Sequence, residues 1–200
     1  MTQSKFYLLR IELLEVEPKI WREFVVPSDI TLDRLHDVVQ IIMGWEQSHL
    51  YQFLLKDKKY SEFLEYIQEF DDIEDSKLVR LNELINRKNQ KVIYEYDFGD
   101  GWQHEISLLN SNYKSKYPYE LQCLNGDRAC PPEDVGGTYG YSHFLKCISD
   151  PQNEEYDEML CWVGGEFESE EFELEYVNFE LIKYYNYARL RALPWCENNN

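Results

Sequence analysis

Two short segments combine side chains that can do chemistry with residues that bend the backbone. The first is YDFGDGWQH, from Tyr96 to His104, and the second is PPEDVGG, from Pro131 to Gly137. Carboxylates can act as general bases or bind hard cations, and an imidazole can transfer protons near neutral pH. We therefore take seven residues of these segments as candidates for a binding pocket: Tyr96, Asp97, Asp100, Trp102, His104, Glu133 and Asp134. His49, which begins an expected strand just beyond Trp45, is an eighth candidate because its place in the sequence permits a shared site.

The first segment also has a structural interpretation. Asp97 and Asp100 flank a tight turn, where carboxylates commonly accept hydrogen bonds from nearby backbone N–H groups. His104 follows on a strand face that is otherwise apolar, which is typical of a histidine in the core with a single polar partner. The alternative places His104 at the edge of the sheet beside Tyr96, where it would line a pocket.

The second segment is stiff at its start and flexible at its end. Two prolines restrict the approach, and two glycines allow backbone angles that other residues avoid. In a structural role, Asp134 would satisfy backbone amides before a helix that starts near Tyr139. In a functional role, Glu133 or Asp134 would face a ligand as a general base or as an oxygen donor to a cation.

No complete catalytic motif accompanies these residues. Asp97-Phe98-Gly99 spells the metal-binding tripeptide of protein kinases, but the catalytic-loop and glycine-rich motifs of kinases are absent. Cys123 and Cys130 are separated by six residues, which is not the usual spacing of zinc ligands. We therefore predict no bound metal and no cofactor, and we leave open whether the protein is an enzyme.

The charge of the chain limits its partners. The formal net charge is −18, and twelve acidic residues with no lysine or arginine lie between Lys146 and Lys183. Binding to nucleic acid depends largely on phosphate neutralisation by lysine and arginine, so nucleic acid is disfavoured, as is an anionic membrane. The acidic run is either a solvated surface or a face for a basic protein partner.

The remaining composition indicates a folded protein of the cytoplasm. The 200 residues are 44% hydrophobic and 16% aromatic, which suits one domain with a substantial core. There is no signal-peptide pattern and no apolar run of membrane-spanning length. Five cysteines without a framework spacing are typical of a reducing compartment. We expect a single domain over residues 1–196 and a frayed tail over residues 197–200.

The expected elements place both segments on connections. Strands are expected first, a helix next, more strands in the middle and helices at the end, so the class is α+β with helices packed on antiparallel hairpins. The most strongly indicated hairpin joins residues 91–97 to residues 102–108 through the Phe98–Gly101 turn. The other expected strands are 6–17, 20–26, 49–55, a short one after 57–59 and 119–124, and the expected helices are 32–43, 81–86, 139–149, 152–163 and one from Asn178.

Four stretches of the chain resemble one protein family, both in their amino-acid sequences and in their order along the chain. They are WREFVVPSDITLDRLHDVVQIIMGWEQSHLYQF, YEYDFGDGWQHEISLL, CLNGDRACPPEDVGGTYGYSHFL and CWVGGEFESEEFELEYVN. Together they resemble the ORF-three-like family of the root-inducing plasmid, from about Tyr7 to Leu181. Many relatives have HLH where this chain has His49-Leu50-Tyr51, and many have a cysteine at Val135. Both differences weaken any metal site that would use those two positions.

The resemblance implies a compact α+β domain found on plasmids and chromosomes. Some members are labelled as resolvase-like passengers of mobile elements, but no catalytic residues are assigned that could be transferred. Our leading hypothesis is a binding or interaction domain whose pocket lies near the two segments, with a small molecule or a basic protein as partner. The alternatives are a hydrolase-type enzyme that uses His104, Asp100, Glu133 and Asp134, and a DNA-associated protein from the mobile-element context.

Overall fold

The centre of the fold is an eight-stranded sheet in which sequence neighbours form hairpins. The structure, a computed structural model, describes residues 5–62, 73–114 and 121–187. The strand order is β5-β4-β3-β6-β7-β1-β2-β8. All neighbouring pairs are antiparallel except β4 and β5. The strands are β1 Phe6–Leu13, β2 Trp21–Pro27, β3 Tyr51–Leu55, β4 Lys58–Ser61, β5 Ile73–Asp75, β6 Lys91–Tyr96, β7 Trp102–Tyr113 and β8 Gln122–Asp127.

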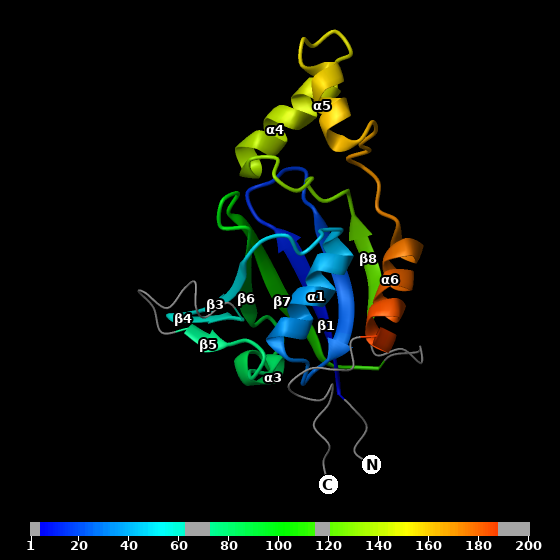
Figure 1. Cartoon of the computed structure of the whole chain (residues 1–200). Helices are drawn as coiled ribbons and strands as arrows, with labels where there is room; N and C mark the ends of the chain where they lie inside the picture. Colours follow the sequence, from blue (N-terminus) through cyan, green and yellow to red (C-terminus); the bar gives the residue numbers. More distant parts are fainter. Residues whose placement is uncertain (1–4, 63–72, 115–120, 188–200) are drawn as a thin grey trace.

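The helices are α1 Leu32–Met43, α3 Leu81–Leu84, α4 Gly137–Ile148, α5 Tyr156–Val163 and α6 Leu174–Tyr187. Helices α1 and α6 lie on one face of this sheet, α4 and α5 lie beyond one of its ends, and the short α3 lies near the other end (Figure 1). Helix α1 crosses one face of the sheet, and α6 packs beside it against β8 (Figure 1). The fold is therefore α+β, as the element order predicts. Within the described ranges, no helix has both the length and the apolar character needed to cross a membrane.

Strand alternation decides which side chains enter the core. In β6, Val92, Tyr94 and Tyr96 are buried, and in β7 the same is true of Trp102, His104, Ile106 and Leu108. The sequence predicts that each set shares a face, because side chains alternate between the two faces of a strand. The opposite positions in these strands are partly or fully exposed. The sheet thus has one packed face and one face toward solvent, as antiparallel sheets commonly do.

Helix α1 is buried nearly all the way round, including its polar residues. The spacing of Leu32, Leu35, Val39 and Ile42 in the sequence predicts an apolar stripe, and all four are fully buried. Gly44 is predicted to end the helix and does so, with a φ of 98°. Burial of polar groups requires hydrogen-bond partners. His36 accordingly meets the Tyr94 hydroxyl at 2.7 Å, and the Gln40 amide donates to the same oxygen at 2.9 Å. The residue types predict Thr31 as the N-cap. Thr31 stands at that position, but its side chain makes no capping hydrogen bond to the helix.

One buried cation joins β2 to two other parts of the chain. Arg22 is 1% exposed, and its Nε atom donates to the carbonyl of Ile42 near the end of α1 at 2.8 Å. Its two Nη atoms donate to the carbonyls of Asp127 and Arg128, each at 2.8 Å, and its guanidinium stacks on the Phe172 ring at 4.0 Å. Arg22 therefore determines where the chain leaves β8.

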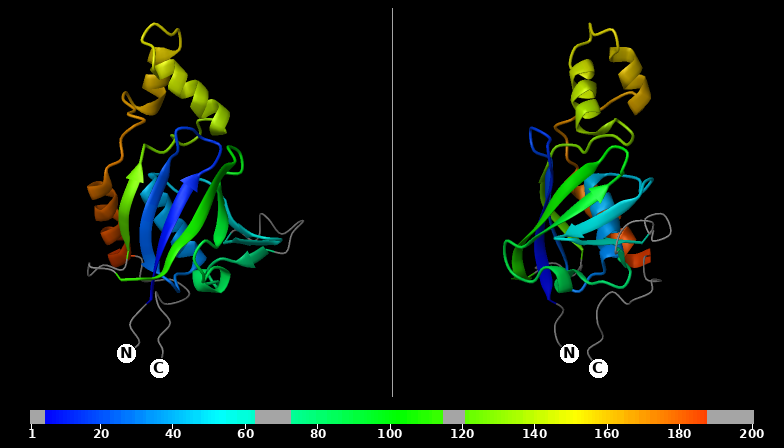
Figure 2. Two further views of the ribbon diagram at one scale, coloured as in Figure 1. Left: turned by 180° about the vertical axis from the view of Figure 1, so that it is seen from behind. Right: turned by 90° about the vertical axis from the view of Figure 1, so that its left-hand side faces the viewer.

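The connections that carry the two candidate segments lie at one end of the sheet. The β6–β7 turn, the loop from α1 to β3 and the segment that enters α4 all meet there, and the α4–α5 pair extends beyond them (Figures 1 and 2). The two segments are about thirty residues apart in sequence. The successive antiparallel pairs β7–β1, β1–β2 and β2–β8 put the start of β7 and the end of β8 at the same end of the sheet.

Several element boundaries differ from the sequence predictions. The first strand ends at Leu13 rather than at residue 17, and β7 continues to Tyr113 rather than ending at residue 108. The last strand spans Gln122–Asp127 rather than residues 119–124, and the last helix begins at Leu174 rather than near Asn178. Helix α5 begins at Tyr156, later than predicted. For β8 and α6, tertiary pairing overrides a weak local signal, because β8 pairs with β2 and α6 packs against β8. The tail predicted over residues 197–200 lies outside the described residues.

We predict that Arg22→Met lowers the free energy of unfolding by at least about 3 kcal/mol, because several buried carbonyls lose their donor together. Urea denaturation monitored by circular dichroism measures this quantity. The matched control is Arg10→Met on the adjacent strand β1. Arg10 also stacks on an aromatic ring at 4.0 Å, but its side chain is 29% exposed and pairs only with surface carboxylates. Arg10→Met should lower the free energy of unfolding by about 1 kcal/mol or less. Equal losses of unfolding free energy in the two variants would contradict the role of Arg22 as a buried anchor.

Candidate functional site

The PPEDVGG segment is attached to the hairpin turn and to the loop after α1 by specific hydrogen bonds. The Trp45 indole donates to the carbonyl of Pro131 at 3.0 Å. The backbone N–H of Gly136 donates to Asp100 Oδ2 at 3.0 Å. The segment therefore lies directly over the turn, and the two segments highlighted by the sequence meet.

His49 lies at the point where these connections converge. Its Nε2 atom is 3.1 Å from Asp134 Oδ1, 3.6 Å from Glu133 Oε2 and 3.7 Å from Asp97 Oδ2. We call these four residues the His49 cluster. The Nε2 atom is buried and has no hydrogen-bond partner of acceptable geometry. An imidazole nitrogen is thus surrounded by carboxylate oxygens without being hydrogen-bonded to any of them.

Two of the carboxylates use one oxygen for structure and leave the other facing His49. Asp97 Oδ1 accepts from the backbone N–H of Gly99 at 2.9 Å, and its Oδ2 faces His49. Glu133 Oε1 accepts from the backbone N–H of Glu46 at 2.9 Å, and its Oε2 faces His49. These bonds orient the carboxylates, so their second oxygens point toward one place.

Tyr96 links the hairpin to the same loop. Its hydroxyl donates to Glu133 Oε1 at 2.9 Å and accepts from the backbone N–H of Ser48 at 3.0 Å. Burial, followed by the hydrogen bond to Glu133 and the charge of its carboxylate, raises the pKa of Tyr96 well above the ordinary value of a phenol. Tyr96 therefore remains a protonated donor at neutral pH and holds Glu133 in position.

The backbone at two cluster residues is in the left-handed region. The φ angles are 53° for Asp97 and 58° for Asp134. Aspartate tolerates this region better than most residues because its short side chain can bond to the local backbone. Outliers of this kind gather at functional sites, where surrounding structure maintains them. Here the positive φ angles accompany the approach of both carboxylates to His49.

Asp100 is a candidate residue that acts through the backbone. Its Oδ2 accepts from the Gly136 N–H, and its carbonyl lies close to the α-carbon of Gly137. Asp100 therefore holds the loop on the turn, and the turn role expected of these carboxylates is also met by Asp97 Oδ1. Asp100 is not among the residues that face His49 Nε2 in the described structure.

Trp102 and His104 are core residues, not part of an open pocket. They are 1% and 0% exposed, respectively. The Nδ1 atom of His104 lies 3.3 Å from the carbonyl of Tyr94, and the ring meets Trp45 edge-on. Burial lowers the pKa of His104 to about 3. The hypothesis that placed His104 at the sheet edge is therefore wrong, and the alternative that assigned it to the core holds.

A second cluster was not recognised as a set from the sequence. His143 and Cys147 lie one turn apart on α4, and Glu155 precedes α5. His143 Nε2 is 3.1 Å from Glu155 Oε2, and Cys147 Sγ is 3.5 Å from the same nitrogen. The i, i+4 spacing of His143 and Cys147 was a visible signal, but the contribution of Glu155 depends on how α5 folds back on α4.

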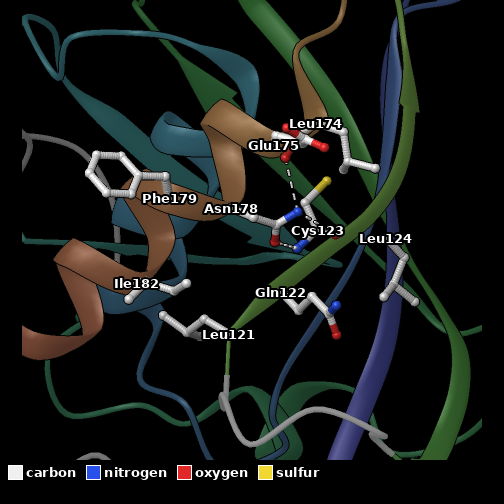
Figure 3. Close-up of a pocket in the computed structure, with 9 residues that line it drawn as sticks. All are labelled: Leu121, Gln122, Cys123, Leu124, Leu174, Glu175, Asn178, Phe179 and Ile182. Carbon is white, nitrogen blue, oxygen red and sulfur yellow. Dashed lines mark hydrogen bonds between the residues drawn. The ribbon is translucent and has the colours of Figure 1, made fainter.

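One cavity of the described structure has mainly apolar walls, and another borders the His49 cluster. A cavity of 490 Å³ between β8 and α6 has mainly apolar walls (Figure 3). Its central polar residue, Asn178, is already bonded to both the N–H and the carbonyl of Cys123, each at 2.9 Å. A cavity of 260 Å³ lies between α4, α5 and the PPEDVGG segment, and Asp134 contributes to its wall. Asp134 is thus the member of the His49 cluster that also lines this cavity.

Comparisons with known proteins agree with the sequence resemblance. Residues 5–176 match the family described as plasmid pRiA4b ORF-3-like protein. "Uncharacterized protein y4hQ" of Sinorhizobium fredii (strain NBRC 101917 / NGR234) is 38% identical over 158 residues, which covers 78% of this chain and 80% of the relative. The crystal structure of "Protein of Unknown Function MM3350" from Methanosarcina mazei Go1 is similar, with a TM-score of 0.77 and 32% identity. The alignment covers 87% of this chain and 98% of that chain.

We predict that Gly137→Ala destabilises the protein more than Gly101→Ala. The two glycines have almost the same φ, +68° and +69°. A Cβ at Gly137 would lie 2.6 Å from the carbonyl oxygen of Asp100, whereas one at Gly101 would meet nothing within 4 Å. Both variants bear the cost of a positive φ, about 1–2 kcal/mol, and only Gly137→Ala must move backbone, which adds about 1–3 kcal/mol. Chemical denaturation measures the difference, and equal losses would show that the loop is not seated on the turn.

We also predict a pH dependence of stability that originates from His104. Its folded-state pKa of about 3 lies below the ordinary value of 6.5, so protons bind preferentially to the unfolded chain. The stabilisation is complete above pH 6.5 and is lost as the pH falls toward 3. His104→Phe should reduce the slope of unfolding free energy against pH by up to about 1.4 kcal/mol per pH unit below about pH 6.5.

The measurement compares urea denaturation of the two proteins between about pH 7.5 and about pH 5, on either side of the ordinary histidine pKa. Their slopes should agree above about pH 7, where the histidine is neutral in both states, and diverge below about pH 6.5. Identical slopes over the whole range would refute the assignment of His104 as a buried neutral imidazole.

Proposed function

The chain belongs to the plasmid pRiA4b ORF-3-like family, and from the site that it carries we propose that it is a binding domain whose ligand presents a positive charge to the His49 cluster. The relatives are named without any activity, so the proposal is based on the site alone. The observation that carries it is the convergence of three carboxylate oxygens on the unpartnered His49 Nε2.

The charge of the cluster supports a cationic ligand. Three carboxylates approach one imidazole, and in the described part of the chain no lysine or arginine lies within ion-pair distance of them. Like charges held close together in a partly buried place repel one another. A bound cation would relieve this repulsion and would satisfy the free oxygens at the same time.

The three carboxylate side chains of the His49 cluster differ in their exposure to solvent, and one of them is open to a ligand. The side chain of Asp97 is 9% exposed, that of Glu133 19% and that of Asp134 71%. Asp97 and Glu133 are therefore held inside, and Asp134 forms the open side next to the 260 Å³ cavity. A ligand can reach the cluster from this side without unfolding the loop.

The enzymatic alternative loses two of its four residues on geometric grounds. His104 is enclosed in the core, and its low pKa leaves it neutral at physiological pH with no open substrate face. Asp100 is committed to Gly136. A general acid or base must come within hydrogen-bond reach of the group that reacts. Glu133 and Asp134 remain, and both belong to the binding cluster proposed above.

We predict that a cation stabilises the wild-type protein through the cluster. Thermal unfolding is measured after EDTA treatment and dialysis, in the presence of Zn²⁺, Mn²⁺, Mg²⁺, Ca²⁺ or spermidine in turn. A cation at about a hundred times its Kd contributes about 2.7 kcal/mol, which raises the Tm of a chain of this size by about 5–10 °C. The double variant Glu133→Gln, Asp134→Asn should lose this shift.

This variant keeps the shape of both side chains, and the amide oxygen introduced at position 133 can still accept from the Tyr96 hydroxyl and the Glu46 N–H. The matched control is the double variant Glu154→Gln, Glu166→Gln, which removes the same charge at exposed positions outside the cluster. It should respond as the wild type does. If none of the cations shifts the wild-type Tm, or if both double variants respond alike, the proposed function fails.

A further inference from the structure

We infer that the cation held by the His49 cluster is a divalent transition-metal ion, bound by His49 Nε2, Asp97 Oδ2 and Asp134 Oδ1, with Glu133 Oε2 as a fourth ligand. This inference rests on the proposed function and narrows its ligand class. It is drawn from the positions of four donor atoms, the state of the histidine nitrogen, and the bonds that orient the carboxylates.

The spacing of the donor atoms suits a single ion. The ligand atoms of His49, Asp97 and Asp134 all lie within 4.8 Å of one another. With metal–ligand bonds of about 2.1 Å, neighbouring ligands of one ion lie about 3.0–3.4 Å apart. The distances from His49 Nε2 to the three carboxylates, 3.1, 3.6 and 3.7 Å, are within a few tenths of an ångström of that range.

Hydrogen bonding does not account for the same geometry. An N–H···O bond requires about 2.7–3.2 Å between heavy atoms and good alignment. Two of the three distances are too long for this, and the contact to Asp134 at 3.1 Å does not meet the geometry of a hydrogen bond. A buried polar atom without a partner is costly. A metal ion at the centre of the cluster would give the His49 nitrogen its missing partner.

The donor set favours a transition metal over calcium or magnesium. Ca²⁺ and Mg²⁺ bind through oxygen ligands and keep waters, whereas imidazole is suited to zinc, iron, nickel and copper. One imidazole and two or three carboxylates fill three or four positions of a first-row ion. Further positions of a five- or six-coordinate ion would remain for water or a ligand atom on the side of the 260 Å³ cavity.

The carboxylates are oriented by the kind of outer contacts that metal ligands have. Ligating groups in metal sites are usually hydrogen-bonded in turn, which fixes their direction. Asp97 is held by the Gly99 N–H, and Glu133 by Tyr96 and the Glu46 N–H. Because the exposed side chain of Asp134 forms one side of the cluster, an ion can reach the site from solvent.

The second cluster does not meet the same conditions. His143 Nε2 is already hydrogen-bonded to Glu155 Oε2, and the thiol of Cys147 lies against the same ring. The side chains of His143 and Glu155 are 46% and 47% exposed, so solvent can satisfy their remaining polar atoms. The contacts among His143, Cys147 and Glu155 therefore need no bound ion, and variants of these residues serve as a control for variants of the His49 cluster.

The test is metal binding measured by isothermal titration calorimetry on the full chain after EDTA treatment, with Zn²⁺, Mn²⁺, Mg²⁺ and Ca²⁺ as probes and a thiol reductant that does not chelate metals. One ion of Zn²⁺ or Mn²⁺ should bind per chain, at least about tenfold more tightly than Mg²⁺ or Ca²⁺. His49→Gln and Asp134→Asn should each weaken this binding at least about tenfold, since even outer contacts of metal sites contribute that much.

The control is the double variant His143→Gln, Cys147→Ser, which should retain the stoichiometry and affinity of the wild type. The circular dichroism spectrum and the Tm in EDTA should be similar in all variants, so that a loss of binding cannot be a loss of fold. The Mn²⁺ complex offers a second readout, because its electron paramagnetic resonance signal should change with His49→Gln.

Four results would overturn the inference. Transition-metal binding that survives both His49→Gln and Asp134→Asn would place the ion elsewhere, as would binding that disappears in the control variant. Binding of Ca²⁺ or spermidine at the cluster without binding of Zn²⁺ or Mn²⁺ would reject the metal class and leave the proposed function standing. The absence of any cation response would reject both.

Discussion

The position of the candidate site depends on the buried guanidinium of Arg22. This side chain ties the end of α1, through Ile42, to the end of β8, through Asp127 and Arg128. The loop after α1 supplies His49, and the chain after β8 supplies the two acidic residues of the PPEDVGG segment. A guanidinium is suited to this task because its donors point outward in one rigid plane and it stays charged when buried.

From that anchor, the site is assembled by carboxylates that serve two purposes. Asp97 and Glu133 each give one oxygen to backbone N–H groups and turn the other toward His49. Asp100 gives its side chain to the N–H of Gly136 and so keeps the loop on the hairpin turn. The cost of gathering negative charge is offset by hydrogen bonds that are charge-assisted, which are stronger than neutral ones. These bonds thus fix the orientation of the carboxylates around His49.

The parts of the fold with strong local signals were predictable. The hairpin of β6 and β7, the apolar stripe of α1 and its glycine end follow from periodicity and turn chemistry, and the structure has them where expected. The boundaries of β8 and α6 could not be predicted from the sequence, because they depend on pairing with β2 and on packing between elements far apart in the chain. The histidines divide in the same way. His104 alternates with apolar residues, so its core position could be expected. His49 was a candidate from the sequence, but its neighbours in the sequence do not show that it is the centre of a cluster.

The sequence by itself determined the family, the α+β class, the hairpin, and the presence of acidic side chains on two connections that bend sharply. These properties follow from residue types and from patterns among residues that are close together in the sequence. Only the tertiary structure decided that His49 joins Asp97, Glu133 and Asp134, and that His104 does not. The physical reason is that their convergence depends on the order of strands in the sheet, on the buried Arg22, and on which oxygen of each carboxylate the backbone occupies.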